Sequence, residues 1–444
     1  MKNQLFNNLN QYSPWQNLLA ACQKKEISAI YDVTESQRAY LAAALSQHTG
    51  RQVLYIAPSE PIARRMAEDA SAFLSGGAAI LETSEVQFLR AVSGREASWQ
   101  RLSIISRIQN KDIKLLCVSA EALLTKYMPQ SIYRQSFFTV KVGDDLEPLI
   151  LMARLNDMGY ERVPMVEGKG QCALIGDILN VFPPDRDQAI RIEFFDTVID
   201  SIRPFDILTQ RSLGKETQAE LGPALEYFLP QDIRAQAAQR MHAALQGAMD
   251  RDLQHLQRFV PQSPQEDHDE EKSQSQANFY RDIERLQDEG FFPNMQLWAN
   301  ILFEQTHHLC DLLNDPIVVV DTPDRSFSRV DERLRGFAED LDLALAREEA
   351  VPAQQYLFYS KDEILSRLKQ QPIATMQELL RGMAGLEPSL TVQIKGEGLS
   401  RYQGRFAELA LNIKQWVSDK YTVAILCSGT ARAQRMQHAL KEFD

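Results

Sequence analysis

The chain has 444 residues, 44% of them apolar, which is enough for two to four domains with hydrophobic cores. Its formal net charge of −12 at pH 7 disfavours tight, sequence-independent DNA binding, which needs clustered lysine and arginine. The five cysteines are far apart and mostly lie in apolar runs, so we expect buried free thiols. Because we find neither a signal peptide nor a run of ~18 apolar residues, we expect a soluble cytoplasmic protein.

Residues 1–135 alternate short apolar segments with helical patterns, and we predict that they form one α/β region. Helices are expected between the strands, for example over 35–48 and 59–74. Strands that alternate with helices predict a parallel sheet covered on both faces. The predicted strands are residues 28–33, 51–58, 78–83 and 113–119.

The pattern of predicted elements changes near residue 136. A strand, a helix and several short β segments predict a small α+β domain inserted at 136–215. Helical patterns return over 216–350, which we treat as a separate region. The acidic stretch 261–276 is predicted to be a solvated loop.

The remaining sequence has weaker patterns. Residues 351–390 are predicted to be a linker with one helix at 375–383, and residues 391–444 the start of a third, truncated domain. That last part is expected to contain a strand at 421–427 followed by a helix. The predicted fold class is therefore α/β: a helicase-like parallel-sheet domain, related to P-loop NTPases but non-functional, with an inserted α+β domain and a partial C-terminal α/β domain.

A phosphate loop would be expected after the first strand, and its frame is Asp32-Val33-Thr34-Glu35-Ser36-Gln37-Arg38-Ala39. The P-loop pattern is G-x-x-x-x-G-K-[ST], in which backbone N–H groups and the lysine bind phosphate and the hydroxyl binds Mg²⁺. Here Asp32 and Gln37 replace the glycines, Arg38 replaces the lysine and Ala39 replaces the hydroxyl. We therefore expect a degenerate nucleotide loop, no catalytic residue and no cofactor in this chain.

No other motif predicts a metal or catalytic centre. His307, His308 and Cys310 are close in sequence, but neighbouring side chains diverge on a helix and no partner pair accompanies them. We expect no metal site.

Residues 176–212 read GDILNVFPPDRDQAIRIEFFDTVIDSIRPFDILTQRS. This segment resembles the UvrB-homology domain 2 of bacterial transcription-repair coupling factor, whose pattern is RGG-I-L-D-V-F-P, a spacer, and R-I-E-F-F-D-x-x-I-x-S-I-R-x-F-D-x-x-[ST]-Q-R-[ST]. Weaker similarity covers most of the chain, and it implies that residues 1–135 and 216–350 are the two parts of one split domain and that residues 391–444 begin a third domain. The resemblance implies a UvrB-like body without ATPase activity that recruits UvrA to lesions at stalled transcription in nucleotide excision repair.

In this family the contacts with RNA polymerase and DNA, and the ATP- and Mg-dependent translocase motor that displaces stalled polymerase, lie in further domains. We find neither an intact P-loop nor a DEAD-type box in the 444 residues. The resemblance therefore implies that these activities lie outside this chain, which we expect to be a monomer.

The strand at residues 190–195 alternates in a way that separates core from surface. A period of two places Ile190, Ile192 and Phe194 on the core face and the intervening side chains on the outer face. An exposed aromatic residue between charged neighbours is typical of an interface hot spot. The alternative is a solvated strand face with Phe195 covered by the following hairpin.

The resemblance carries the UvrA contacts of the family onto Arg191 and Phe195, with Glu193 between them and Arg203 at a further motif position. The sequence departs from the family where the first arginine of RGG is Ile175. This change leaves three possibilities: a co-adapted partner, a weaker interface, or replacement by a nearby basic residue.

Other positions near this face have two interpretations. Lys169 is a candidate for the replacement of the missing arginine, and Asp177 and Asn180 are further departures from the pattern. The motif residues Phe205, Asp206 and Arg211 are equally compatible with structural and functional roles, since an aspartate there can cap a turn.

The sequence leaves two alternative functions to be considered. An NTPase or helicase fragment would bind ATP, which the loop at Asp32–Ala39 disfavours. A UvrB-like binder of damaged DNA would need a tyrosine-rich hairpin, and residues 81–102 contain no such pattern.

Overall fold

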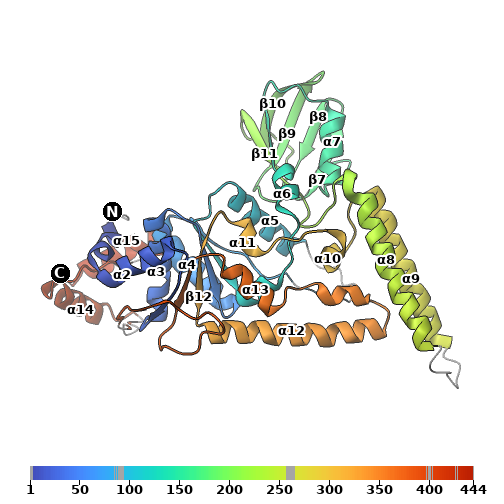
Figure 1. Ribbon diagram of the computed structural model, residues 1–444. Coiled ribbons are helices and arrows are strands. Elements are labelled where there is room, and N and C mark those ends of the chain that lie inside the picture. The colour runs from blue at the N-terminus through green and yellow to red at the C-terminus, as the bar shows by residue number, and fades with distance from the viewer. Residues whose placement is uncertain are drawn as a thin grey trace.

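A seven-stranded parallel sheet forms the centre of the computed structural model (Figure 1). The structure describes residues 4–84, 86, 88, 95–256, 266–396, 398, 402, 404–425, 427 and 429–443, with the side chains of 248–256 and 266–276 left aside. The strand order is β14-β1-β13-β12-β2-β4-β3, and every neighbouring pair is parallel. The strands are β1 (Ile27–Tyr31), β2 (Val53–Ala57), β3 (Ala78–Ile80), β4 (Leu115–Ser119), β12 (Ile317–Asp321), β13 (Ile373–Met376) and β14 (Leu390–Gln393).

Helices cover both faces of this sheet, as its uninterrupted apolar strands require. Val53 and Tyr55 of β2 pack against α2 (Ser13–Gln23), α3 (Glu35–Thr49) and α4 (Glu60–Leu74). The alternate residues Leu54 and Ile56 pack with α5 (Glu96–Gln109) and α12 (Pro323–Ala346) on the other face. The α/β class with a large parallel sheet is therefore confirmed.

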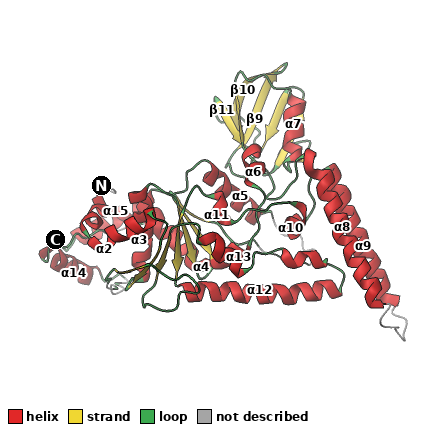
Figure 2. Cartoon of the chain, in the orientation of Figure 1, coloured by secondary structure: helices red, strands yellow, loops and turns green. Residues whose placement is uncertain are grey.

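A separate sheet, antiparallel except for the parallel pair of β6 and β7, stands away from the body (Figure 2). Its order is β10-β9-β8-β7-β6, and α7 (Pro148–Asp157) packs on its inner face. Its strands are β6 (Glu161–Arg162), β7 (Gln171–Ile175), β8 (Ile178–Val181), β9 (Ala189–Phe195) and β10 (Val198–Phe205). β5 (Phe138–Lys141) pairs with β11 (Gln218–Leu221) and joins the two ends of the insert.

A buried ion pair fixes the insert to the body. Arg101 of α5 donates two hydrogen bonds of 2.7 Å to the two carboxylate oxygens of Glu226, which follows β11. Both side chains are only 11% exposed, so the pair is shielded from water. This ion pair therefore ties the end of the insert to α5.

Two long helices, α8 (Gln231–Leu256) and α9 (Glu266–Asp288), lie side by side at the far end of the body (Figure 1). The acidic stretch predicted to be a loop is helical from Glu266 onward, so that prediction is wrong for most of its length. The shorter helices are α1 (Gln4–Asn7), η1 (Asn8–Gln11), η2 (Ala120–Leu124), α6 (Gln130–Ser136), η3 (Met295–Trp298), α10 (Ala299–Leu302), α11 (Leu309–Leu312), η4 (Pro352–Tyr356), α13 (Lys361–Leu368), α14 (Phe406–Ser418) and α15 (Thr430–Lys441).

The prediction of a linker at 351–390 is wrong. It supplies β13, a central strand between β1 and β12, and the predicted helix at 375–383 does not form. β14, assigned to a third domain, is an edge strand of the first sheet, and described residues 421–425 form no strand and are largely exposed. The helix expected after them is α15. The other domain boundaries stay predictions.

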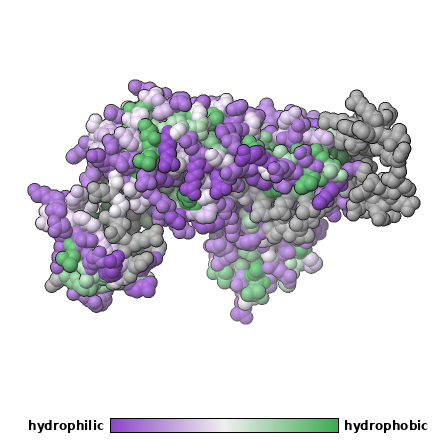
Figure 3. All heavy atoms as spheres, turned by 90° about the horizontal axis from the view of Figure 1, so that it is seen from below, coloured by the Kyte–Doolittle hydropathy of each residue, from purple (hydrophilic) through white to green (hydrophobic). Residues whose placement is uncertain are grey.

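Along the described part of the chain, no helix combines the length and the apolar character needed to cross a bilayer. The face shown in Figure 3 is mainly hydrophilic, with small hydrophobic groups between the hydrophilic residues.

Candidate functional site

The loop at Asp32–Ala39 leaves the carboxyl end of β1 and enters α3. Asp32 has a φ of +66°, and its N–H donates to the carbonyl oxygen of Glu378 at 3.0 Å. The Val33 N–H donates to the carbonyl oxygen of Gln377 at 3.4 Å. These two backbone donors of the loop are therefore paired with the chain that follows β13.

The Gln37 side chain closes the loop on itself. Its Oε1 accepts a 3.0 Å hydrogen bond from the Thr34 N–H, which completes a capping box at the start of α3. The backbone after β14 lies directly against this amide, because a Cβ added at Gly396 would be 1.6 Å from Gln37 Oε1. Protein atoms therefore fill the space beside the second degenerate glycine position.

Arg38, at the position of the P-loop lysine, forms a buried ion pair. Its Nη1 donates to Asp321 Oδ1 at 2.6 Å, and the two side chains are 12% and 1% exposed. The hydroxyls of Tyr55 and Thr322 donate to the same carboxylate at 2.8 and 2.7 Å. Burial, and then the neighbouring carboxylate, raise the pKa of Tyr55 well above its ordinary value, so the phenol stays a donor.

Ala39 is buried at the fourth position of the degenerate motif and offers no hydroxyl. Sequence reasoning found the four loop positions but missed Asp321, which is 283 residues away from Arg38. The sequence feature that could have pointed to Asp321 is its position at the end of the apolar run of β12.

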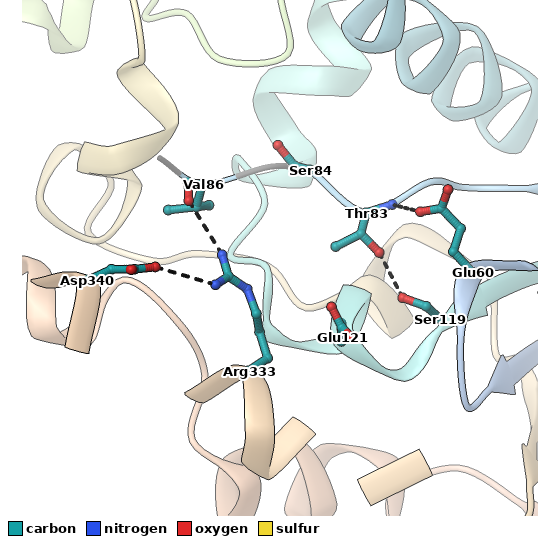
Figure 4. Close-up of a pocket in the computed structure, with 8 residues that line it drawn as sticks. All are labelled: Glu60, Thr83, Ser84, Val86, Ser119, Glu121, Arg333 and Asp340. Carbon is teal, nitrogen blue, oxygen red and sulfur yellow. Dashed lines mark hydrogen bonds and ion pairs between the residues drawn. The ribbon is translucent and has the colours of Figure 1, made fainter. Parts of the chain in front are cut away.

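A pocket of about 410 Å³ lies beyond the ends of β3 and β4 (Figure 4). Thr83 and Ser119 share a 2.7 Å hydrogen bond, and the Arg333 guanidinium donates to the Val86 carbonyl oxygen at 3.4 Å. Three carboxylates and one guanidinium are an unfavourable balance for an anionic ligand. The lining residues, none of which the sequence singled out, are Glu60, Thr83, Ser84, Val86, Ser119, Glu121, Arg333 and Asp340.

Strand β9 has the two faces predicted from its alternation. Ile190, Ile192 and Phe194 are buried in the core of the insert, which confirms the prediction. On the outer face Phe195 is 79% exposed, so the hairpin that follows does not cover it. Exposure of a phenylalanine to this degree leaves most of its apolar surface in water.

Arg191 lies on the same outer face and is held by three partners. Its Nε donates to Asn180 Oδ1 at 2.9 Å, its Nη1 donates to the Gln210 carbonyl oxygen at 3.2 Å, and its guanidinium lies 4.7 Å from the Phe205 ring centroid. The departure from aspartate to asparagine at position 180 therefore keeps an acceptor for Arg191. The guanidinium is fixed in position and half-buried.

Glu193 and Arg203 form the next pair along the face. Arg203 Nη2 lies 3.4 Å from Glu193 Oε2, and the Ser201 hydroxyl donates to the same oxygen at 2.5 Å. The structure thus brings together the predicted residues of β9 and β10, with their opposite charges paired within the protein.

Ile175 ends β7 and pairs with Ile178 across a tight turn. The structure does not place Lys169 beside it. Lys169 precedes β7 and donates to the Pro184 carbonyl oxygen at 3.0 Å, near α5, whereas Ile175 lies at the opposite end of the strand. Replacement of the missing arginine by Lys169 is therefore contradicted by geometry.

The motif residues after β10 form a turn. Asp206 Oδ1 accepts hydrogen bonds from the Thr209 N–H at 2.7 Å and the Thr209 hydroxyl at 2.9 Å, which lower the pKa of Asp206. Phe205 is buried in a small cluster on the outer face, whereas Arg211 is exposed. Of the two interpretations of Asp206 that the sequence left open, these hydrogen bonds show the turn-capping one.

Two further predictions from the sequence concern a metal site and a UvrB-type hairpin. Among the described residues, no group of three or more histidine, cysteine, aspartate or glutamate side chains is arranged to hold a metal ion, and His308 accepts a hydrogen bond from the Cys310 N–H. The predicted absence of a UvrB-type hairpin falls partly on residues 85, 87 and 89–94, which lie outside the described residues.

The insert matches a known domain family, and most of the chain is similar to known proteins. Residues 138–227, which include all the strands of the insert, match the family model of the UvrB interaction domain. The transcription-repair-coupling factor of Bacillus subtilis is 25% identical over 415 residues, which are 92% of this chain and 34% of that protein. The factor of Myxococcus xanthus is 32% identical over 209 residues, 45% of this chain and 17% of that protein. The factor of Staphylococcus haemolyticus is 23% identical over 351 residues, 78% of this chain and 28% of that protein.

The chain spans about a third of the length of the Bacillus subtilis relative, and less of the other two. The resemblance predicted from residues 176–212 is confirmed: the chain carries a UvrB interaction domain and is a relative of the N-terminal, UvrB-homologous region of the transcription-repair-coupling factors.

Proposed function

We propose that this chain is a protein-binding module that recruits UvrA to lesions at stalled transcription, through the outer face of the insert. The observation that carries the proposal is Phe195, which is 79% exposed on a strand whose alternate residues are fully buried. A large aromatic side chain left in water contributes little to folding, but it becomes a strong anchor when a partner covers it.

The surroundings of Phe195 suit a protein partner. Arg191 is pre-organised by Asn180 and Phe205, so little rotamer freedom is lost when a partner binds. The Glu193–Arg203 pair lies beside it at the rim, where charged groups mainly set orientation and association rate. The matched family model covers all of these residues.

We also propose that the loop at Asp32–Ala39 binds no nucleotide, and that this chain has no catalytic activity and needs neither ATP nor Mg²⁺. Arg38 is engaged by Asp321, and the backbone at Gly396 lies against Gln37. A triphosphate would have to displace these contacts and approach two carboxylates, Asp32 and Glu35, at close range.

The activity of the whole protein is a further proposal. The relatives are between two and three times as long as this chain, since the matched residues are 92%, 45% and 78% of this chain but 34%, 17% and 28% of those proteins. We propose that the ATP-dependent DNA translocase motor and the contacts with RNA polymerase and DNA belong to segments beyond the matched part, and that this chain acts as a monomer.

Isothermal titration calorimetry of the chain with the UvrA of its own organism tests the UvrA proposal. We expect micromolar or tighter binding that Phe195→Ala weakens about 30-fold and Arg191→Ala also weakens strongly. Leu208→Ala is the matched control, because Leu208 is an apolar residue of the same insert that is 89% exposed. Equal effects of all three variants, or no binding by the intact chain, would overturn the proposal.

The two alternative functions have their own readouts. A nucleotide that binds the folded chain raises its melting temperature, so unchanged melting with millimolar ATP and Mg²⁺ is expected and stabilisation would support an NTPase. Binding of damaged duplex at low salt would support the UvrB-like DNA binder, whereas we expect none.

A further inference from the structure

A pocket of about 310 Å³ lies where the insert meets the body, next to α5, which lies beneath the insert in Figure 1. The body contributes α4, α5 and the end of β3 to its walls, and the insert contributes the loop before β7 and the loop between β8 and β9. These two loops precede β7 and β9, whereas Ile175 and Phe195 end the same strands. The pocket is therefore at the other end of the insert from Phe195, and no residue proposed above to bind UvrA lines it.

Part of the pocket wall is apolar. It is formed by Ile80, Ile104, Pro184 and the half-buried indole of Trp99. The N–H edge of this indole lies beside Gly170, where an added Cβ would be 3.5 Å from the ring. The indole N–H has no acceptor among the residues that the structure describes. An unused indole donor beside apolar side chains suits the backbone carbonyl of a peptide.

Three carboxylates of the pocket carry negative charge that is not neutralised within the described part of the chain. Glu96 and Asp187 are exposed, and neither they nor Asp185 form an ion pair with another described residue. One carboxylate oxygen of Asp185 accepts a 2.7 Å hydrogen bond from the Ser106 hydroxyl, whereas the other, Oδ1, is buried without a hydrogen-bond partner. A carboxylate oxygen that is shielded from water and lacks a donor is unfavourable, so a cation that enters this pocket is stabilised.

The basic residues of the pocket leave this negative charge in place. Arg64 lies 2.6 Å from Glu82, and Arg101 is held by the buried ion pair that ties the insert to α5. Lys169 has no carboxylate partner among the described residues, and its ammonium donates to the Pro184 carbonyl oxygen at 3.0 Å. The groups without an ion pair are therefore three carboxylates and one ammonium. The remaining N–H bonds of Lys169 can donate to a peptide carbonyl.

We propose that this pocket binds an arginine side chain presented by a segment of a protein partner. The guanidinium lies among Glu96, Asp185 and Asp187 and stacks on the Trp99 indole, which arginine does more readily than lysine. The carbonyl groups next to that arginine accept hydrogen bonds from the Trp99 N–H and from Lys169. An occupant of this kind touches α5 and the insert at once, so it also holds the insert against the body. The inference does not depend on UvrA recruitment, which we assign to the opposite end of the insert.

Fluorine NMR of the full chain, with fluorotryptophan in place of its four tryptophans, tests the pocket. Trp99→Phe identifies the signal of Trp99, and Trp298, which is buried in η3, serves as the internal reference. The probe is the tripeptide Leu-Arg-Leu with both ends blocked, and the control is the same peptide with neutral citrulline in place of arginine. We expect the arginine peptide to shift the Trp99 signal saturably at millimolar concentration, and the citrulline peptide to bind about ten-fold more weakly. No saturable shift, or equal affinity for the two peptides, would overturn the proposal.

Substitutions test which charges act. Glu96→Gln combined with Asp187→Asn should weaken binding of the arginine peptide about ten-fold and leave binding of the citrulline peptide unchanged, because only the charged peptide uses the carboxylates. Asp200→Asn is the matched control, since Asp200 is an exposed aspartate of the same insert that does not line the pocket. All three residues are exposed, and an unchanged melting temperature verifies that each variant is folded. If the double variant bound the arginine peptide as tightly as the intact chain does, the carboxylates would not form the arginine site and the proposal would be refuted.

Discussion

The ion pair between Arg38 and Asp321 should make the degenerate loop a major contributor to the stability of the parallel-sheet domain. In Arg38→Met the methionine keeps most of the apolar stem and removes the charge. Asp321 is then left in a site where its side chain is 1% exposed, with only the hydroxyls of Tyr55 and Thr322 as donors. Removal of one partner of such a buried pair costs about 3–5 kcal/mol.

Two further variants isolate the cause. Arg38→Met combined with Asp321→Asn removes the uncompensated charge and keeps the hydroxyl contacts, so it should recover more than half of the loss. Arg65→Met is the matched control, because Arg65 forms a 2.7 Å pair with Glu35 in which both side chains are exposed. Such a surface pair contributes about 0.2–1 kcal/mol.

Urea unfolding followed by circular dichroism measures the free energy of unfolding of the four proteins in parallel. The expected order of stability places Arg65→Met near the unchanged chain, the double variant next and Arg38→Met last. If Arg38→Met were no less stable than Arg65→Met, the ion pair would not stabilise the loop and the reasoning would be refuted.

Three more predictions concern stability. Burial lowers the pKa of His308 to about 4, so the stability that its neutral form gives above pH ~6.5 is lost as the pH falls toward 4. His308→Asn should flatten this acid dependence by up to about 3 kcal/mol, measured as the free energy of unfolding at pH 7 and pH 4.5. Arg101→Ala should cost about 3–5 kcal/mol by leaving Glu226 unpaired, and a thermal melt equal to that of the unchanged chain would contradict this. Gly396→Ala should cost about 1 kcal/mol because it displaces the capping amide of Gln37, and a double-mutant cycle with Gln37→Ala should show that the two changes are not additive.

Local patterns predicted those parts of the fold that local physics decides. Continuous apolar runs identified β2 and β4, since strands buried on both faces must be apolar throughout. The two-residue period of β9 separated Phe194, which is buried, from Phe195, which is exposed. Both results need only the geometry of a single strand.

The missed elements depend on neighbours in space. β13 is only four residues long, and it forms because the backbones of β1 and β12 offer hydrogen-bond partners on both sides. The segment around 421–425 has a comparable apolar pattern but no neighbouring strand among the described residues. For the same reason, the partner of Arg38 could not be found from sequence, since strand order brings Asp321 beside it across 283 residues.

Stability and binding are assigned to different residues on this chain. At the degenerate loop the charges of Arg38 and Asp321 are buried and paired, so a change there affects folding. At the distal end of the insert Phe195 and Ile175 are exposed, and their apolar surface is not used by the fold. Substitution of these exposed residues should therefore change affinity for a partner without changing the free energy of unfolding. Variants of the degenerate loop and variants of the outer face of the insert therefore have separate readouts. The free energy of unfolding reports on the loop, and the affinity for a partner reports on the outer face.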